Sequence, residues 1–213
     1  MSLSRLQRTL PWITVVTVLI VRPCAAENWP GFRGPTGQGI SREKNLPLTW
    51  SLAENVAWRV EIPGIGWSSP VVWENRVFVT SATPDGTSCH VICIDAEHGK
   101  VLWDKEVFRQ ESPRKMAENS HATPTPVTDG SGVYAAFNGG RIVAVDFDGH
   151  VTWSWRDGQF VSKHGLAASP ILYRDLLIMP FDGNGPADVD NIGFRTAWDG
   201  AFVVALDKRS GQP

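Results

Sequence analysis

Short runs in which apolar and polar residues alternate recur along the chain, separated by glycine, proline, asparagine and aspartate. Alternation with a period of two residues is typical of half-buried strands, and no segment shows the 3.6-residue period of an amphipathic helix. The pattern therefore predicts an all-β fold of short antiparallel strands. The clearest strands are expected at 56–62, 70–73, 76–81, 90–94 and 101–107.

One sequence unit occurs three times. Each copy opens on a proline that leads into an apolar strand, and the prolines at 70, 126 and 170 are 56 and then 44 residues apart. Each copy closes on an Asp and then a Gly, and the first two copies have a Trp four residues after the Gly. A period of this length with several strands per repeat indicates β-propeller blades of four antiparallel strands. The closing residues are Asp95, Gly99 and Trp103, then Asp146, Gly149 and Trp153, then Asp207 and Gly211.

These repeated residues have structural roles. Proline can begin a strand without removing a needed ladder hydrogen bond. The Asp and Gly are expected to form the turn before the outer strand, with Gly in the left-handed conformation. The Trp offers a large apolar face to the next blade.

Trp58 occupies the phase of a closing Trp but has no complete unit before it. A propeller closes in this way when its N-terminal strand completes the last blade, which removes an exposed sheet edge. The third copy reaches Pro213, and its Trp is expected two residues farther on. We therefore expect about three blades at 67–107, 121–157 and 166–213, with the missing blades supplied in cis or by another chain.

Residues 1–26 have the pattern of a secretory signal peptide. Arg5 and Arg8 precede an apolar run at 10–21, and Cys24-Ala25-Ala26 offers small residues for cleavage after Ala26. We expect an exported protein that is periplasmic, on the cell surface or secreted, and peripheral to a membrane at most. A lipoprotein or an uncleaved anchor is the alternative, but Arg22-Pro23 does not suit lipidation of Cys24.

The rest of the composition narrows the function classes. The formal net charge is −2 and no basic stripe occurs, which argues against nucleic acid as a partner. Cys89 and Cys93 lie four residues apart in one extended stretch, so their Cα atoms should be about 13 Å apart, too far for a disulfide. We expect buried free thiols and no zinc site. Residues 27–49, rich in glycine and proline, are expected to form an irregular lead-in segment to the propeller at 50–213.

The candidate ligand residues lie just before the inner strands, where propellers place ligands at one mouth of the central channel. The functional interpretation is a polar ring that binds a ligand, and the structural alternative is that these residues satisfy strand ends and fill the channel. The candidates are Trp67, Ser68, Ser120, His121, Lys163 and His164.

Other chemistry finds less support, and no catalytic or metal-binding residue is assigned. Oxygen-bearing residues gather at 182–191 in the insertion at 181–200, but their spacing does not match a calcium loop, and a solvated loop is expected. Ser120-His121 lacks a Gly-x-Ser-x-Gly nucleophile elbow and a residue placed to orient the base.

The Asp-x-x-x-Gly-x-x-x-Trp pattern resembles the tryptophan-docking repeat of pyrroloquinoline quinone (PQQ) enzymes and of their cofactor-free relatives in outer-membrane barrel assembly. The lead-in at 29–35 looks like the opening of a group of exported PQQ-like propeller proteins. The resemblance implies roughly seven or eight blades in the whole ring.

The resemblance leaves two functions open. The first is a non-enzymatic binding or scaffold module whose partner is a protein segment or a glycan, with no cofactor. The alternative is a quinoprotein dehydrogenase that uses PQQ and calcium to oxidise alcohols or sugars. The adjacent Cys-Cys pair of those enzymes does not occur in this sequence.

Overall fold

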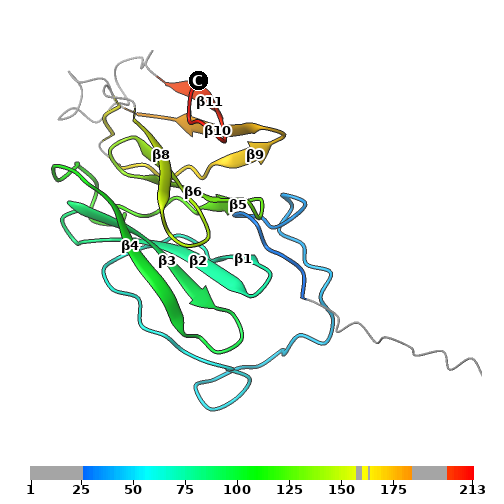
Figure 1. Cartoon of the computed structure of the whole chain (residues 1–213). Helices are drawn as coiled ribbons and strands as arrows, with labels where there is room; N and C mark the ends of the chain where they lie inside the picture. Colours follow the sequence, from blue (N-terminus) through cyan, green and yellow to red (C-terminus); the bar gives the residue numbers. More distant parts are fainter. Residues whose placement is uncertain (1–25, 157–159, 163, 184–200) are drawn as a thin grey trace, which may run out of the picture.

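A computed structural model describes residues 26–156, 160–162, 164–183 and 201–213. These residues form three antiparallel sheets, stacked like blades (Figure 1). The predicted all-β propeller blades are therefore confirmed. No helix long and apolar enough to cross a membrane occurs among the described residues.

The first blade is β1 (Val71–Trp73), β2 (Arg76–Ala82), β3 (Ser88–Asp95) and β4 (Val101–Arg109). The second is β5 (Val127–Thr128), β6 (Val133–Phe137), β7 (Arg141–Val145) and β8 (Val151–Arg156). The third is β9 (Ile171–Tyr173), β10 (Leu176–Phe181) and β11 (Phe202–Asp207).

The core lies between the blades, because successive side chains of a strand point to opposite faces of its sheet. In β6, Val133, Ala135 and Phe137 pack against the first blade, whereas Tyr134 and Ala136 pack against the third. β5, β6 and β7 of the second blade are consequently covered on both faces, whereas its outer strand β8 is largely exposed.

The turn before each outer strand is built by the repeated aspartate. The Asp95 carboxylate accepts hydrogen bonds from the backbone N–H groups of Glu97 and His98 at 3.1 and 2.7 Å. Gly99 then adopts φ of 67°, which glycine accepts without strain. These hydrogen bonds, above all the one from the His98 N–H, hold the pKa of Asp95 below its usual value. The same arrangement recurs at Asp146 and Asp207.

Each repeat tryptophan docks on the aspartate turn of the following blade. The indole Nε1 of Trp103 donates to the Phe147 carbonyl, and that of Trp153 donates to the Lys208 carbonyl, both at 2.9 Å. In both cases the acceptor is the residue after the turn aspartate. The turn glycine lies under the indole, because a Cβ at Gly211 would come within 2.6 Å of the Trp153 ring. The predicted packing of each Trp on the next blade is confirmed.

The expected strand at 56–62 is wrong, because this segment forms no strand. A strand requires a neighbour for its backbone hydrogen bonds, and none of the described strands pairs with this segment. Trp58 nevertheless docks as a closing Trp should. Its Nε1 donates to the Ala96 carbonyl at 2.9 Å, and its ring lies over Gly99. The position inferred for Trp58 within the repeat is correct, but the strand predicted around it is wrong.

Cys89 and Cys93 are free and buried, as predicted. Burial raises the pKa of Cys89 to about 12 and that of Cys93 to about 11. Thiolates are the reactive form. We therefore expect neither thiol to react with iodoacetamide at neutral pH in the folded chain, and both to react once urea unfolds it. Mass spectrometry of the alkylated protein measures this, and rapid labelling of the folded chain would contradict it.

Candidate functional site

The lead-in segment runs across the inner edges of the first two blades, beside β1 and β5 (Figure 1). Trp29 and Val72 exchange two backbone hydrogen bonds, at 2.9 and 2.8 Å. The next residue, Pro30, accepts a hydrogen bond from the Thr128 N–H at 2.9 Å. The chain then turns back, with a bond from Gly34 N–H to the Gly31 carbonyl at 3.0 Å. The lead-in therefore pairs with two inner strands and turns away before it reaches the third.

A row of hydroxyl groups links the inner strands around the axis. The residue before each repeat proline is Ser69, Thr125 or Ser169. The Ser69 N–H donates to Oγ1 of Thr125, and the Thr125 N–H donates to Oγ of Ser169, both at 3.0 Å. The sequence carried this signal, a hydroxyl before each repeat proline, but the prediction did not use it. These bonds fix the positions of neighbouring inner strands.

A cavity of about 920 Å³, which we call the axial cavity, lies between the lead-in loop and the inner strands. Its walls combine apolar surface with the hydroxyls of the row described above. Trp67 is 55% exposed and Phe32 is 56% exposed, so both offer free aromatic surface. The lining residues are 30–37, Trp67, Trp73, Thr123, Thr125, 127–129 and 167–172.

The structure does not bring the sequence-predicted ligand residues together at one site. Trp67 lines the axial cavity, and the nearby Ser68 hydroxyl accepts a hydrogen bond from the Thr80 N–H at 3.2 Å. Ser120 and His121 are buried and line a second cavity of about 120 Å³, which Trp67 also lines. His164 is exposed, and its carbonyl accepts a bond from Asn119. Lys163 lies outside the described residues.

His121 is held in a structural setting. A Cβ at Gly86 would come within 2.4 Å of the His121 ring, so the first blade packs closely on it. Its Nδ1 lies 3.2 Å from Nδ2 of Asn138, and its carbonyl accepts the Asn138 N–H at 3.0 Å. These contacts correspond to the structural alternative for His121, in which the residue fills space and satisfies backbone groups.

The setting of His121 predicts a pH dependence of stability. Desolvation, followed by the charge of Lys115, lowers the pKa of His121, so the folded chain favours the neutral ring. The unfolded chain takes up the proton near the usual value of about 6.5, so stability falls as pH drops below that value. We expect the urea midpoint to decrease from about pH 7.5 to about pH 5.5, and to decrease less in His121→Gln, whose side chain does not titrate. An equal decrease of the urea midpoint with pH in both proteins would contradict this prediction.

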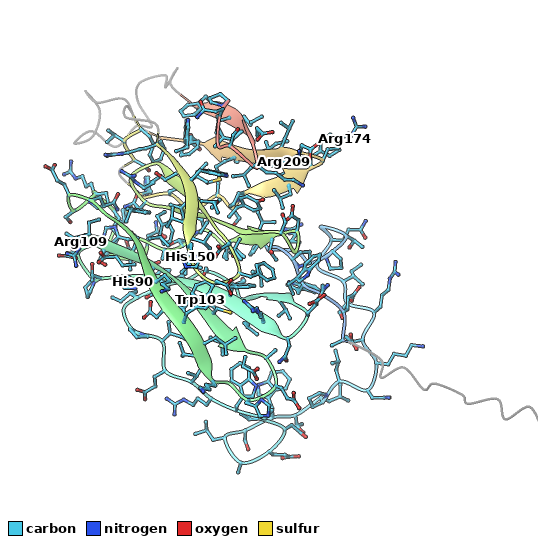
Figure 2. All side chains as sticks on the ribbon, in the orientation of Figure 1. His90, Trp103, Arg109, His150, Arg174 and Arg209 are labelled. Carbon is cyan, nitrogen blue, oxygen red and sulfur yellow. The ribbon has the colours of Figure 1, made fainter. Side chains whose placement is uncertain are left out.

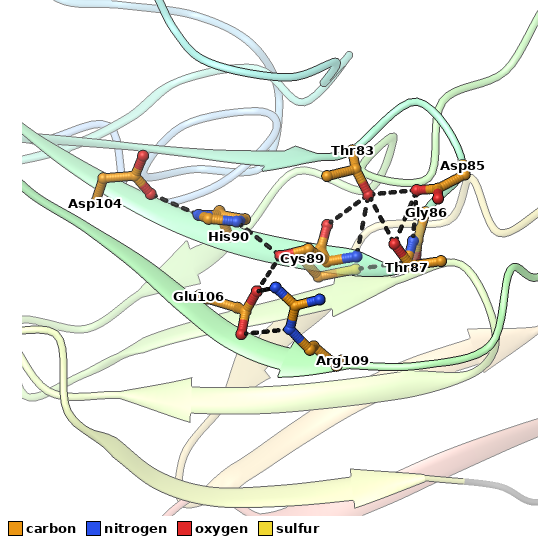
Figure 3. A network of polar contacts seen from close by, with 10 residues as sticks. Thr83, Asp85, Gly86, Thr87, Cys89, His90, Asp104, Glu106 and Arg109 are labelled. Carbon is orange, nitrogen blue, oxygen red and sulfur yellow. Dashed lines mark hydrogen bonds and ion pairs between the residues drawn. The ribbon is translucent and has the colours of Figure 1, made fainter.

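A polar network on β3 and β4 has a Ser-His-Asp order (Figure 3). His90 Nδ1 lies 2.7 Å from Asp104 Oδ1, and His90 Nε2 lies 2.9 Å from the Ser88 hydroxyl. Ser88 is 4% exposed, however, and its hydroxyl donates to Glu106. A nucleophile needs access to substrate and a base that takes its proton. Ser88 lacks this access, and its proton is directed at Glu106 and not at His90. The network therefore ties the outer strand to its neighbour, and Figure 2 places His90 and Arg109 along this pair of strands.

The described residues assemble no cluster of carboxylates of the kind that binds calcium. Calcium takes six to eight oxygen ligands, and the described part of the chain brings together no group of three or more His, Cys, Asp or Glu that could hold a metal. Asp129, the carboxylate among the cavity lining residues, lies 2.9 Å from the Lys208 ammonium. Most of the oxygen-rich stretch at 182–191 lies outside the described residues.

Comparison with known families decides where this propeller belongs. The family described as outer membrane protein assembly factor BamB matches residues 51–213, which include every repeat. The chain belongs to this family of PQQ-repeat β-propellers. No curated protein matches the chain.

Two solved structures are similar to this chain. Quinohemoprotein alcohol dehydrogenase from Comamonas testosteroni is 16% identical with a TM-score of 0.56, and the match covers 87% of this chain and 26% of the dehydrogenase. BamB from Moraxella catarrhalis is 17% identical with a TM-score of 0.46, and the match covers 74% of this chain and 38% of BamB. The chain thus spans less than half of either protein, and the likeness to the dehydrogenase shows the fold alone.

Proposed function

We propose that this chain is part of an exported, non-enzymatic propeller that binds an extended segment of another macromolecule in the axial cavity. The observation that carries the proposal is the cavity of about 920 Å³, in which Trp67 and Phe32 offer exposed aromatic surface beside a row of hydroxyl groups. Apolar walls with a few placed polar groups are typical of binding sites. The family description as an assembly factor supports a protein segment over a glycan as the partner.

The proposal is tested with a peptide array and a glycan array probed with the full chain. Trp67→Ala removes an exposed cavity wall and is expected to reduce binding of the best probe by about tenfold. Trp50→Ala is the matched control, because Trp50 is 69% exposed and is not a cavity lining residue. Equal binding by the two variants, or no binding to any probe, would overturn the proposal.

Export is a second part of the proposal and has its own test. The basic residues Arg5 and Arg8, the apolar run at 10–21 and the small residues before Glu27 support cleavage of a signal peptide. We expect the protein recovered outside the cytoplasm of a bacterial host to begin at Glu27. N-terminal sequencing measures this, and full-length protein confined to the cytoplasm would contradict it.

A further inference from the structure

Equivalent positions occur on the inner strands of the three blades. Val72, Thr128 and Leu172 each lie two residues after a repeat proline. Val72 pairs with Val77, and Leu172 pairs with Leu177. Val72 and Leu172 therefore occupy equivalent positions in the hydrogen-bond ladders of their blades. Because hydrogen-bonded pairs alternate along an antiparallel ladder, residues in the same place point their N–H and C=O groups to the same side. The N–H of Val72 points to the free edge, where it meets the lead-in.

Two of these three positions are already occupied by an extended backbone. Val72 exchanges two hydrogen bonds with Trp29, and Thr128 donates one to Pro30. Within the described residues, the backbone of Leu172 makes no hydrogen bond to a segment outside the β9–β10 pair. The lead-in turns back at Gly31–Gly34 and leaves the β9 edge facing the cavity, of which Leu172 is a lining residue.

We propose that an extended segment of another protein pairs with the inner edge of β9 through the backbone of Leu172. This inference rests on the proposed function and names the chemistry of recognition. An edge strand is a template for a further strand, and main-chain hydrogen bonds then supply affinity that does not depend on the partner's side chains. The lead-in shows that this propeller accepts such pairing at the two equivalent edges.

The cavity walls define the side chains that the segment should carry. Ile171 is 58% exposed and lies beside Leu172, while Phe32 and Trp67 expose aromatic surface on the other sides. Alternate residues of an extended peptide point to opposite sides. The partner segment should therefore carry apolar side chains at alternate positions, facing this wall.

The experiment selects seven-residue peptides from a phage-displayed library on the full chain and measures the binding of the best peptide by fluorescence polarisation. Leu172→Pro removes the backbone N–H, whereas Leu172→Ala removes the same side chain but keeps the N–H. We expect Leu172→Pro to weaken binding by about tenfold more than Leu172→Ala. Since Leu172→Pro can also disturb β9, the peptide is remade with N-methyl groups at successive positions and tested on the unsubstituted chain. We expect methylation at alternate positions to abolish binding.

The outcomes separate this inference from the proposed function. Unchanged binding after methylation, together with equal binding by the two Leu172 variants, would overturn the strand pairing. If Trp67→Ala still weakened binding, the cavity would remain the site and the proposed function would stand. Binding of glycans but not of peptides would also leave the function standing and overturn the inference. A synthetic peptide of residues 27–33 that bound better than every selected peptide would identify a second copy of this chain as the occupant, and would overturn the assignment to another protein.

Discussion

Replacing Gly149 with alanine is expected to lower the free energy of unfolding by about 3 kcal/mol, as a combined cost of backbone strain and steric clash. Gly149 has φ of 86°, a conformation that other residues rarely adopt. An added Cβ would lie 2.7 Å from Cγ of Lys105 and 3.0 Å from Cδ2 of Trp103. The indole cannot withdraw without losing the 2.9 Å hydrogen bond from its Nε1 to the Phe147 carbonyl. Urea unfolding monitored by circular dichroism measures the loss.

Gly39→Ala is the matched control for backbone strain without a steric clash. Gly39 has φ of 75°, and a Cβ there would meet nothing within 4 Å, so this variant pays the conformational cost of about 1 kcal/mol without a clash. A double-mutant cycle with Trp103→Ala isolates the contact, because Gly149→Ala should cost less once the indole is gone. Equal losses at the two glycines would show that the docked indole tolerates the added methyl group.

The docking glycines also show why the repeat was readable from the sequence. A turn that holds φ near 70–90° under an indole admits few residues besides glycine. A glycine at this position of the sequence therefore indicates the turn. The aspartate that satisfies two turn N–H groups and the tryptophan four residues after the glycine follow from the same local geometry. Spacing therefore predicted the blades, their turns and the phase of Trp58.

The site was harder to predict because its parts come together only through long-range pairing. The lead-in looked irregular from its glycines and prolines, yet Trp29 and Pro30 pair with the inner strands of two different blades. No local pattern specifies which edge such a segment will meet. The strand expected at 56–62 shows the same limit, because alternation records a tendency to be extended and not the presence of a partner strand.

The candidate residues before the inner strands were chosen by their place in the repeat, and burial separates them. Trp67 keeps free surface in the axial cavity, whereas Ser120 and His121 are buried between neighbouring segments. His121 and Asn138 are 17 residues apart and meet only in the folded chain. Asn138 precedes Gly139 in the turn between β6 and β7, and Asn-Gly is a pair typical of hairpin turns. Its further contacts had no signal in the sequence.

Those contacts make Asn138→Ala the second substitution with a large expected effect. The side chain is 1% exposed, and its Nδ2 donates to the Arg114 carbonyl at 2.9 Å. Its Oδ1 accepts the Leu166 N–H at 3.2 Å, so one amide joins the connection before the second blade to the start of the third. Alanine leaves both backbone groups without this partner. Leu166 is buried, and a buried unsatisfied N–H costs about 1–3 kcal/mol, so we expect a loss of about 2 kcal/mol in urea unfolding.

Asn75→Ala is the control, because Asn75 is an exposed turn residue whose Nδ2 donates to Asp95 at 2.9 Å, and this loss should stay below about 1 kcal/mol. Asn138 also contacts His121, so Asn138→Ala should change both the free energy of unfolding and its dependence on pH. Asn75→Ala should leave the pH dependence unchanged. Equal losses for the two asparagines would mean that water replaces the Asn138 amide. In that case neighbouring blades would be held together by the docked tryptophans and apolar packing, without a need for this buried polar link.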